Sequence, residues 1–405
     1  MVLARALVML LLAVSACRGA RPPGPQPSPP RFIENDYARA LAEARSRDLP
    51  LFIDAWAPWC HTCLSMRAYV LSDALLAPFA ARFVFLSLDT ERDDSAPVVA
   101  KLGVRVLPTM FVMNPGEEKV VFEWPGSMTA GELAALLADA SAKAKPTRWL
   151  DRDRLADARV TKLAEAKRFP ECVQAASDEA PAMPMGTALL DVLRAGLDCA
   201  TSLPAGSPDR GKVDGLVARG EQAVSQASTA VLADDRSDLY DYLVATLRAL
   251  DRGAEAARVA GDWARFLEEE ASHAPTPSAR AVFDAHRLGA YLALGEPQRA
   301  VPMLAQSERD FPEDYNPPAR LGTAYLAMKR YDDALDATTR ALGRAYGPRK
   351  LRLWSLDADI LLAKGDDAGA KKALRAALDF ARTTPMTGSY PKLRDAIEKR
   401  LAAMP

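Results

Sequence analysis

The chain has 405 residues, of which 49% are hydrophobic, and its formal net charge is −1. This length is sufficient for two domains. A net charge near zero argues against nucleic acid or an acidic membrane surface as a partner. With three histidines and five cysteines in the chain, a metal site rich in histidine is not expected, and we predict no cofactor.

The first 17 residues have the pattern of a cleaved export signal. Arg5 is the only early charge, and the apolar run that follows over residues 6–13 is too short to span a bilayer as a permanent helix. The run leads into VSAC at residues 14–17, which resembles the lipobox of bacterial lipoproteins. On this interpretation Cys17 is lipid-modified and becomes the mature N-terminus. The alternative is a plain secretory signal that is cut after residue 16 or 20.

Residues 18–31, RGARPPGPQPSPPR, contain six prolines and no apolar periodicity. Such a segment is a semi-rigid spacer that reaches roughly 3 Å per residue, or about 40 Å in all. Arg18, in place of an aspartate after the cysteine, resembles the lipoproteins that are sorted to the outer membrane. We therefore expect a lipid-anchored protein of the bacterial cell envelope that faces the periplasm, at the outer rather than the inner membrane.

Residues 32–146 alternate between helical and strand patterns. Apolar runs predict strands, and amphipathic periodicity predicts helices. The expected strands are 51–53, 83–86, 109–112 and 119–124, and the expected helices are 37–46, 60 to beyond 70, 96–102 and 129–142. Strands that alternate with helices, followed by a hairpin turn at 114–117, predict an α/β sheet covered by helices.

Cys60 and Cys63 lie in DAWAPWCHTC, where a predicted strand gives way to a helix. A cysteine attacks a disulfide as the thiolate, and the unpaired N–H groups and positive dipole of a helix N-terminus favour that anion. We therefore interpret Cys60 as the attacking thiol and Cys63, one helical turn further on, as the resolving thiol. A zinc site would need a second CxxC or a histidine pair at ligand spacing. A structural disulfide with two intervening residues would constrain the unfolded chain little.

Several segments together resemble a known family. FIDAWAPWCHTC, KLGVRVLPTMFVMNP and the order of the elements resemble a thioredoxin fold across this domain. The CxxC spacing, LSD at 71–73 and LDTERDD at 88–94 are most similar to the periplasmic thioredoxin-like domain of the DsbD family of thiol reductases. The resemblance implies thiol–disulfide oxidoreductase activity.

The resemblance also assigns roles to residues around the dithiol. Asp54 matches the buried acid that exchanges a proton with the second cysteine, a task that a raised pKa in an apolar setting would suit. The alternative is a solvated loop aspartate. Pro108 matches the cis-proline that faces the active site. The alternative is an ordinary turn proline, since cis is the minority isomer for prolines in general. Leu107 would offer backbone groups to an extended substrate.

The sequence departs from the common thioredoxin pattern at two places. His61 and Thr62 stand between the cysteines where thioredoxins have Gly-Pro. A protonated His61 would stabilise the Cys60 thiolate and favour oxidation of clients, whereas a neutral, exposed His61 would have little effect. The strand FVFLSLD also lacks the lysine that thioredoxins commonly place near the acid. Trp59 is expected to pack at the rim of the site, and the direction of electron flow stays open.

Residues 147–405 consist of alanine-rich amphipathic segments with an internal repeat. Tyr-Leu-Ala at 291–293 recurs 34 residues later at 325–327, which is the tetratricopeptide period. The segment 321–342 closely resembles one such unit, and 361–378 resembles a further copy. Weaker helical hairpins are expected over 154–168, 212–231 and 236–269. Stacked helix pairs form a curved solenoid whose concave side usually binds peptides; the alternative is a scaffold for the first domain.

Cys172 and Cys199 lie on two predicted neighbouring helices, 161–177 and 187–200. We predict a structural disulfide that joins this hairpin and contributes about 3 kcal/mol through loop entropy. Two buried reduced cysteines are the alternative.

Two classes of function are compatible with these features. The first is a lipid-anchored thiol–disulfide oxidoreductase that acts on exported client proteins, uses a membrane thiol electron donor or acceptor, and holds clients on its helical array. The second is a non-catalytic envelope adaptor that uses the array for protein–protein interaction. The complete set of Cys60, Cys63, Asp54 and Pro108 favours the enzyme.

Overall fold

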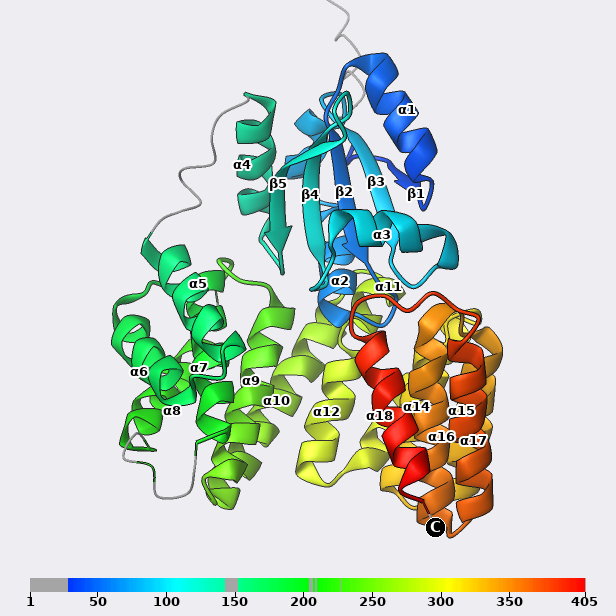
Figure 1. The fold of residues 1–405 in the computed structure, drawn as a ribbon. Helices are drawn as coiled ribbons and strands as arrows, with labels where there is room; N and C mark the ends of the chain where they lie inside the picture. The colour runs from blue at the N-terminus through cyan, green and yellow to red at the C-terminus, as the bar shows by residue number, and fades with distance from the viewer. Residues whose placement is uncertain (1–27, 143–151, 204–206, 208–209, 227, 405) are drawn as a thin grey trace, which may run out of the picture.

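The computed structural model describes residues 28–142, 152–203, 207, 210–226 and 228–404. A sheet domain comes first, and helices alone follow from Arg152 onward, arranged in a curved array beside one end of the sheet (Figure 1). The predicted α/β domain followed by a helical-repeat array is therefore confirmed. Cys17 and its signal sequence, most of the proline-rich spacer and the predicted boundary at residue 146 lie outside the described residues.

Five strands form one mixed sheet in the order β1-β3-β2-β4-β5. Their bounds are β1 Phe32–Glu34, β2 Leu51–Trp56, β3 Val84–Asp89, β4 Thr109–Asn114 and β5 Lys119–Pro125. β1, β3 and β2 are parallel, whereas β4 pairs antiparallel with both β2 and β5. The three central strands are almost wholly buried, as expected of continuous apolar runs that are covered on both faces.

Helices cover both faces of the sheet. On one face, α1 (Tyr37–Arg47) and α3 (Ala96–Leu102) pack on the apolar side chains of β2, β3 and β4. On the other, the π-helical turn η1 (Met66–Val70), the 3₁₀ turn η2 (Ala74–Phe79) and α4 (Ala130–Ser141) enclose a second core. A capping box between Thr129 and Glu132 fixes the start of α4.

The rest of the described chain is helical, and no described helix is both long and apolar enough to cross a membrane. The helices are α5 (Arg152–Glu165), α6 (Phe169–Glu179), α7 (Thr187–Thr201), α8 (Arg210–Ser225), α9 (Ala233–Ala249), α10 (Gly253–His273), α11 (Pro277–Ala281), α12 (Asp284–Leu294), α13 (Ala300–Asp310), α14 (Asn316–Ala327), α15 (Tyr331–Arg344), α16 (Lys350–Lys364), α17 (Asp367–Ala381) and α18 (Tyr390–Ala402).

The repeat signal corresponds to three successive helix pairs, α12 with α13, α14 with α15, and α16 with α17. The first helices of these pairs contact one another in order, and α18 then packs on α16 and α17. Close packing within a pair explains Gly322, because a Cβ there would lie 2.6 Å from the Thr338 methyl carbon on α15.

Cys172 on α6 and Cys199 on α7 are joined in a disulfide with a Cα–Cα distance of 6.3 Å. The predicted single helix over 161–177 was wrong. α5 ends at Glu165 and α6 begins at Phe169, because Lys167 adopts a positive φ of 56° and Pro170 occupies the first turn of α6.

Candidate active site

Cys60 and Cys63 lie where β2 leads into a helix, as the sequence predicts. The short helix α2 (His61–Ser65) begins directly after Cys60, which is its N-cap residue. The Cys60 Sγ accepts a hydrogen bond from the Cys63 backbone N–H at 3.1 Å, and the two cysteines form a disulfide. After reduction, the same N–H and the positive end of the helix would stabilise a Cys60 thiolate.

The loop before β4 packs against this disulfide. The Leu107–Pro108 peptide bond is cis, and the Pro108 carbonyl accepts a hydrogen bond from Gly126 N–H at 2.8 Å. Leu107 lies in the small apolar cluster around the two cysteines, together with Trp56, Ala57 and Trp59. The residues that the resemblance assigns to the substrate-facing loop are therefore next to the dithiol.

Asp54 is buried in β2, with a relative exposure of 1%. Burial raises its pKa to about 7, with Arg67 lowering it and Glu34 raising it by smaller amounts. Its Oδ2 has no hydrogen-bond partner among the described residues. A carboxyl group with a pKa near neutrality can both accept and release a proton under physiological conditions.

Arg67 is the cation nearest to this acid, and the sequence reasoning missed it. Its guanidinium lies 3.9 Å from Asp54 Oδ2 and stacks on the Trp56 ring at 4.1 Å. Thioredoxins commonly carry a lysine on the strand next to the acid, whereas Arg67 comes from η1, which continues α2. Its position four residues after Cys63, on the same helical face, was the available signal.

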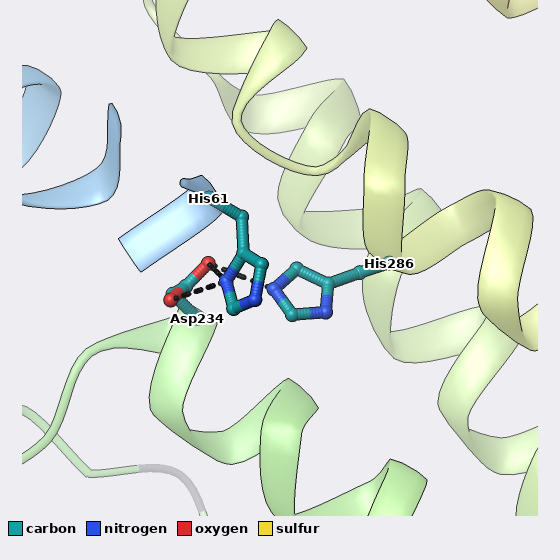
Figure 2. A group of neighbouring side chains, drawn as sticks. All are labelled: His61, Asp234 and His286. Carbon is teal, nitrogen blue, oxygen red and sulfur yellow. Dashed lines mark hydrogen bonds and ion pairs between the residues drawn. The ribbon is translucent and has the colours of Figure 1, made fainter. Parts of the chain in front are cut away.

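His61 contacts the helical array through Asp234, which interacts with both His61 and His286 (Figure 2). Its Nδ1 lies 3.1 Å from Asp234 Oδ2, while Asp234 Oδ1 lies 2.8 Å from His286 Nε2. Asp234 comes from the first turn of α9 and His286 from α12, so the bridge joins the two domains. The Thr62 hydroxyl also lies 3.2 Å from His61 Nδ1.

These contacts set the charge of His61, which the sequence left open. Burial alone would lower the pKa of His61, but Asp234, and to a lesser extent Asp238, raise it to about 9. Although burial opposes ionisation of Asp234, the two histidines hold its pKa below the usual range. His61 is therefore an imidazolium at neutral pH.

The same three residues are also the one group of potential metal ligands found in the described part of the chain. Their ligand atoms lie within 4.8 Å of one another. Two imidazoles and a carboxylate are a ligand set that zinc accepts. Each imidazole is already bonded to a carboxylate oxygen of Asp234, so the cluster is accounted for as a hydrogen-bonded ion pair.

The helical array packs against the active-site loop, a feature with no sequence signal. Cys60 is 5% exposed and Cys63 1%. Asn316 Nδ2 donates to the Pro58 carbonyl at 3.0 Å. Glu91 accepts from the Trp59 indole at 2.9 Å and from the Tyr390 hydroxyl at 2.8 Å.

Comparison with known proteins identifies the family of the first domain. A family model described as thioredoxin-like matches residues 32–115. Thioredoxin from Haemophilus influenzae is 34% identical over 87 residues, which cover 22% of this chain and 76% of that protein. Chloroplastic thioredoxin M4 of Arabidopsis thaliana is 30% identical over 90 residues, and the match spans only 43% of its length and 22% of this chain.

The solution structure of a thioredoxin from Thermus thermophilus is also similar. The match covers 28% of this chain and 88% of the thioredoxin, with 23% sequence identity and a TM-score of 0.26. The sequence matches agree with the sheet order, the cysteine pair and the cis-proline described above. Through residues 32–115, the chain belongs to the thioredoxin family.

Proposed function

We propose that this protein is a thiol–disulfide oxidoreductase of the bacterial cell envelope that exchanges disulfides with exported client proteins. The observation that carries the proposal is the position of Cys60, at the N-terminus of α2 and in contact with Leu107 of the cis-proline loop. The lipid anchor at Cys17 and the periplasmic location rest on the VSAC sequence and the proline-rich spacer. The helical repeats would hold clients or redox partners.

Reduction of a client proceeds in two exchange steps. The Cys60 thiolate attacks one sulfur of the client disulfide, which forms a mixed disulfide and releases the other client sulfur as a thiolate. Cys63 then attacks Cys60 Sγ, so that the Cys60–Cys63 disulfide forms and the second client sulfur leaves. The Cys63 proton passes to Asp54 during this attack and then to solvent or the departing thiolate. Two electrons have moved to the client, and oxidation of a client is the reverse sequence.

A membrane thiol donor or acceptor would return the pair to its starting state. The reduction potential of Cys60 and Cys63 decides the direction of net flow. A value near about −270 mV would make the protein a reductant, and one near about −120 mV would make it a donor of disulfides.

Trapping of mixed disulfides tests the proposal. With Cys63→Ala, the second step is blocked, and client proteins should remain attached to Cys60 in a bond that dithiothreitol cleaves. The Cys60→Ala/Cys63→Ala double variant is the matched control and should trap nothing.

The enclosed position of Cys60 favours a second candidate, a non-catalytic adaptor that binds partners through the helical array. In that case Cys63→Ala would capture no specific protein, while the same partners would co-purify with the wild type and with both variants.

A further inference from the structure

A cavity of about 390 Å³ lies between the active-site loop and the helical array. Trp59, which directly precedes Cys60, forms one side. The other lining residues come from α12, α14, α16 and α18 and from the 3₁₀ turn η7 (Gly347–Arg349). These helices contact one another in succession. Because Trp59 also lines the cavity, the cavity is on the face of the array that is turned toward the thioredoxin domain.

Three arginines line this cavity: Arg320, Arg349 and Arg352. Within the described chain, none of them forms an ion pair within 4.0 Å or a hydrogen bond. Arg349 lies 5.0 Å above the Trp59 ring, and its buried Nε has no hydrogen-bond partner among the described residues. Arginines elsewhere on the array behave differently; Arg340, for example, forms ion pairs with Glu308 and Asp336.

The acidic groups around the cavity leave these guanidinium donors unused. Asp359 is the one carboxylate in the lining, and it is paired with Arg400 at 2.5 Å. Asp284 and Asp314 act on Arg320 only through longer-range electrostatics. Glu91 acts in the same way on Arg349, and its hydrogen bonds go to Trp59 and Tyr390.

We propose that the cavity binds an aspartate- or glutamate-containing segment of the client polypeptide, next to the client cysteine that reacts with Cys60. Guanidinium groups present paired N–H donors in a fixed plane that matches a carboxylate. Because Trp59 both lines the cavity and directly precedes Cys60, a carboxylate bound there lies next to the active-site loop. An extended chain advances about 3.3 Å per residue, so the acidic residue stands within a few positions of the client cysteine.

The binding step is tested without any redox chemistry. The probe is a fluorescent, cysteine-free peptide with four glutamates, and its control has four glutamines at the same positions. Fluorescence anisotropy with the full chain should show binding of the glutamate peptide alone. Arg352→Gln and Arg320→Gln should each weaken its Kd by about tenfold, the scale of one charge-assisted hydrogen bond.

Arg352 is exposed, so its substitution tests the site even if Arg320→Gln impairs folding. Arg382→Gln is the matched control, because it removes the same charge from a side chain that is 77% exposed after α17. Equal binding of both peptides, or equal weakening by Arg382→Gln and Arg352→Gln, would overturn the proposal.

The assignment of the bound segment to a client rests on the proposed function and is tested by exchange kinetics. Two disulfide peptides, one flanked by glutamates and the other by glutamines, are compared with hydroxyethyl disulfide. Exchange about tenfold faster with the glutamate peptide, lost in Arg352→Gln and retained in Arg382→Gln, supports the inference. Equal rates with the two peptides contradict it even though the proposed activity is present. Absence of exchange with all three substrates refutes the proposed function itself, while the anisotropy result still decides whether the cavity binds carboxylates.

Discussion

The carboxyl group of Asp54 is buried in the folded protein and exposed in the unfolded chain. Its pKa therefore differs between the two states, and its ionisation is coupled to folding. Its pKa is about 7 in the folded protein and 3.8 for the unperturbed group. The folded state therefore holds the proton more tightly, and the stability of the protein falls as pH rises from 3.8 to about 7. The shift corresponds to about 4 kcal/mol at the upper limit.

Asp54→Asn should remove this dependence. The variant should unfold at a higher temperature than the wild type at pH 8 and at nearly the same temperature at pH 4, when both are oxidised. Thermal unfolding followed by circular dichroism at the two pH values measures this. A difference that does not change with pH would show that Asp54 keeps an ordinary pKa in the folded protein.

The same substitution should slow catalysis. Without a group to accept the Cys63 proton, resolution of the mixed disulfide should slow by about 10²-fold, the lower end of the range for a positioned acid or base. Stopped-flow measurement of single-turnover reduction of a small disulfide gives this rate. Ser72→Ala, a change at an exposed side chain just after η1, is the control and should react at the wild-type rate. An unchanged rate in Asp54→Asn would remove Asp54 from the proton path.

Asp234 determines the charge of His61, with Asp238, His286 and Arg320 as the other charged or titratable groups around it. The pKa of His61 is about 9 because of Asp234. In Asp234→Asn, the negative charge that offsets the effect of burial on the His61 pKa is removed. The His61 imidazole should therefore titrate at least two pH units lower. The Hε1 resonance of His61, followed by NMR against pH, reports this directly. Asp241→Asn is the control, because Asp241 is a nearby carboxylate that forms no hydrogen bond or ion pair with His61.

Because the folded pKa of His61 lies above 6.5, its pairing with Asp234 stabilises the folded protein fully below pH 6.5 and progressively less as pH rises through about 9. A titration midpoint that stays near 9 in Asp234→Asn would show that another group holds the proton on His61.

At the level of single residues, what could be predicted depended on distance along the chain. Cys60, Cys63 and Asp54 lie within ten residues of one another and carry a recognisable spacing. Asp234 contacts His61 across 173 residues, and no local pattern marks it. Arg67 is intermediate, since helical periodicity placed it near Cys63 but nothing in the sequence indicated that it would point toward Asp54.

The α6–α7 hairpin is the element whose stability depends on a covalent link. The Cys172–Cys199 disulfide closes a loop with a sequence separation of 27. Loop entropy predicts that its removal lowers the free energy of unfolding by about 3 kcal/mol. The Cys172→Ala/Cys199→Ala variant, compared with the wild type in urea titrations of the oxidised proteins, measures the loss.

The active-site disulfide offers a matched control for that experiment. Its two cysteines are only three positions apart, so Cys60→Ala/Cys63→Ala should cost less by loop entropy. Equal losses in the two double variants would mean that the lost packing of the sulfur atoms, and not the closed loop, accounts for the effect.

Prediction of the elements succeeded where apolar runs or periodicity extended over several residues. α4 agrees with its predicted range to within one residue at each end. The three central strands begin within one residue of the predicted starts but extend two or three residues beyond the apolar runs that predicted them. β1 was missed, since three residues show no period and its pairing with β3 depends on the rest of the sheet. The false helix over 161–177 arose because Lys167, a good helix former, adopts a left-handed conformation there.

For the molecule as a whole, the sequence predicted two domains but not that the second would cover the active site of the first. The contact depends on pairs such as Asn316 with Pro58 and Tyr390 with Glu91, which are more than 250 residues apart. Cys60 is 5% exposed, and we therefore expect this contact to loosen when a client reaches it. On this expectation, the domain contact would control access to the dithiol.

Gly347 offers a way to test that control. It adopts a positive φ of 56°, and a Cβ at this position would lie 1.8 Å from the Glu91 carbonyl oxygen of the thioredoxin domain. Gly347→Ala should therefore push the two domains apart at η7. Strain of about 1–3 kcal/mol, typical of overpacking, would raise the population of an open form by about fivefold to 150-fold.

The rate at which Cys60 reacts with a bulky maleimide, measured in the Cys63→Ala background, reports that population, and Gly347→Ala should increase it by the same factor. Gly343→Ala is the matched control, because a Cβ there meets no atom within 4 Å and should leave the rate unchanged. If the two glycine variants label at equal rates, the helical array does not limit access to Cys60. If only Gly347→Ala is faster, the array acts as the gate through which a client must pass before exchange can begin.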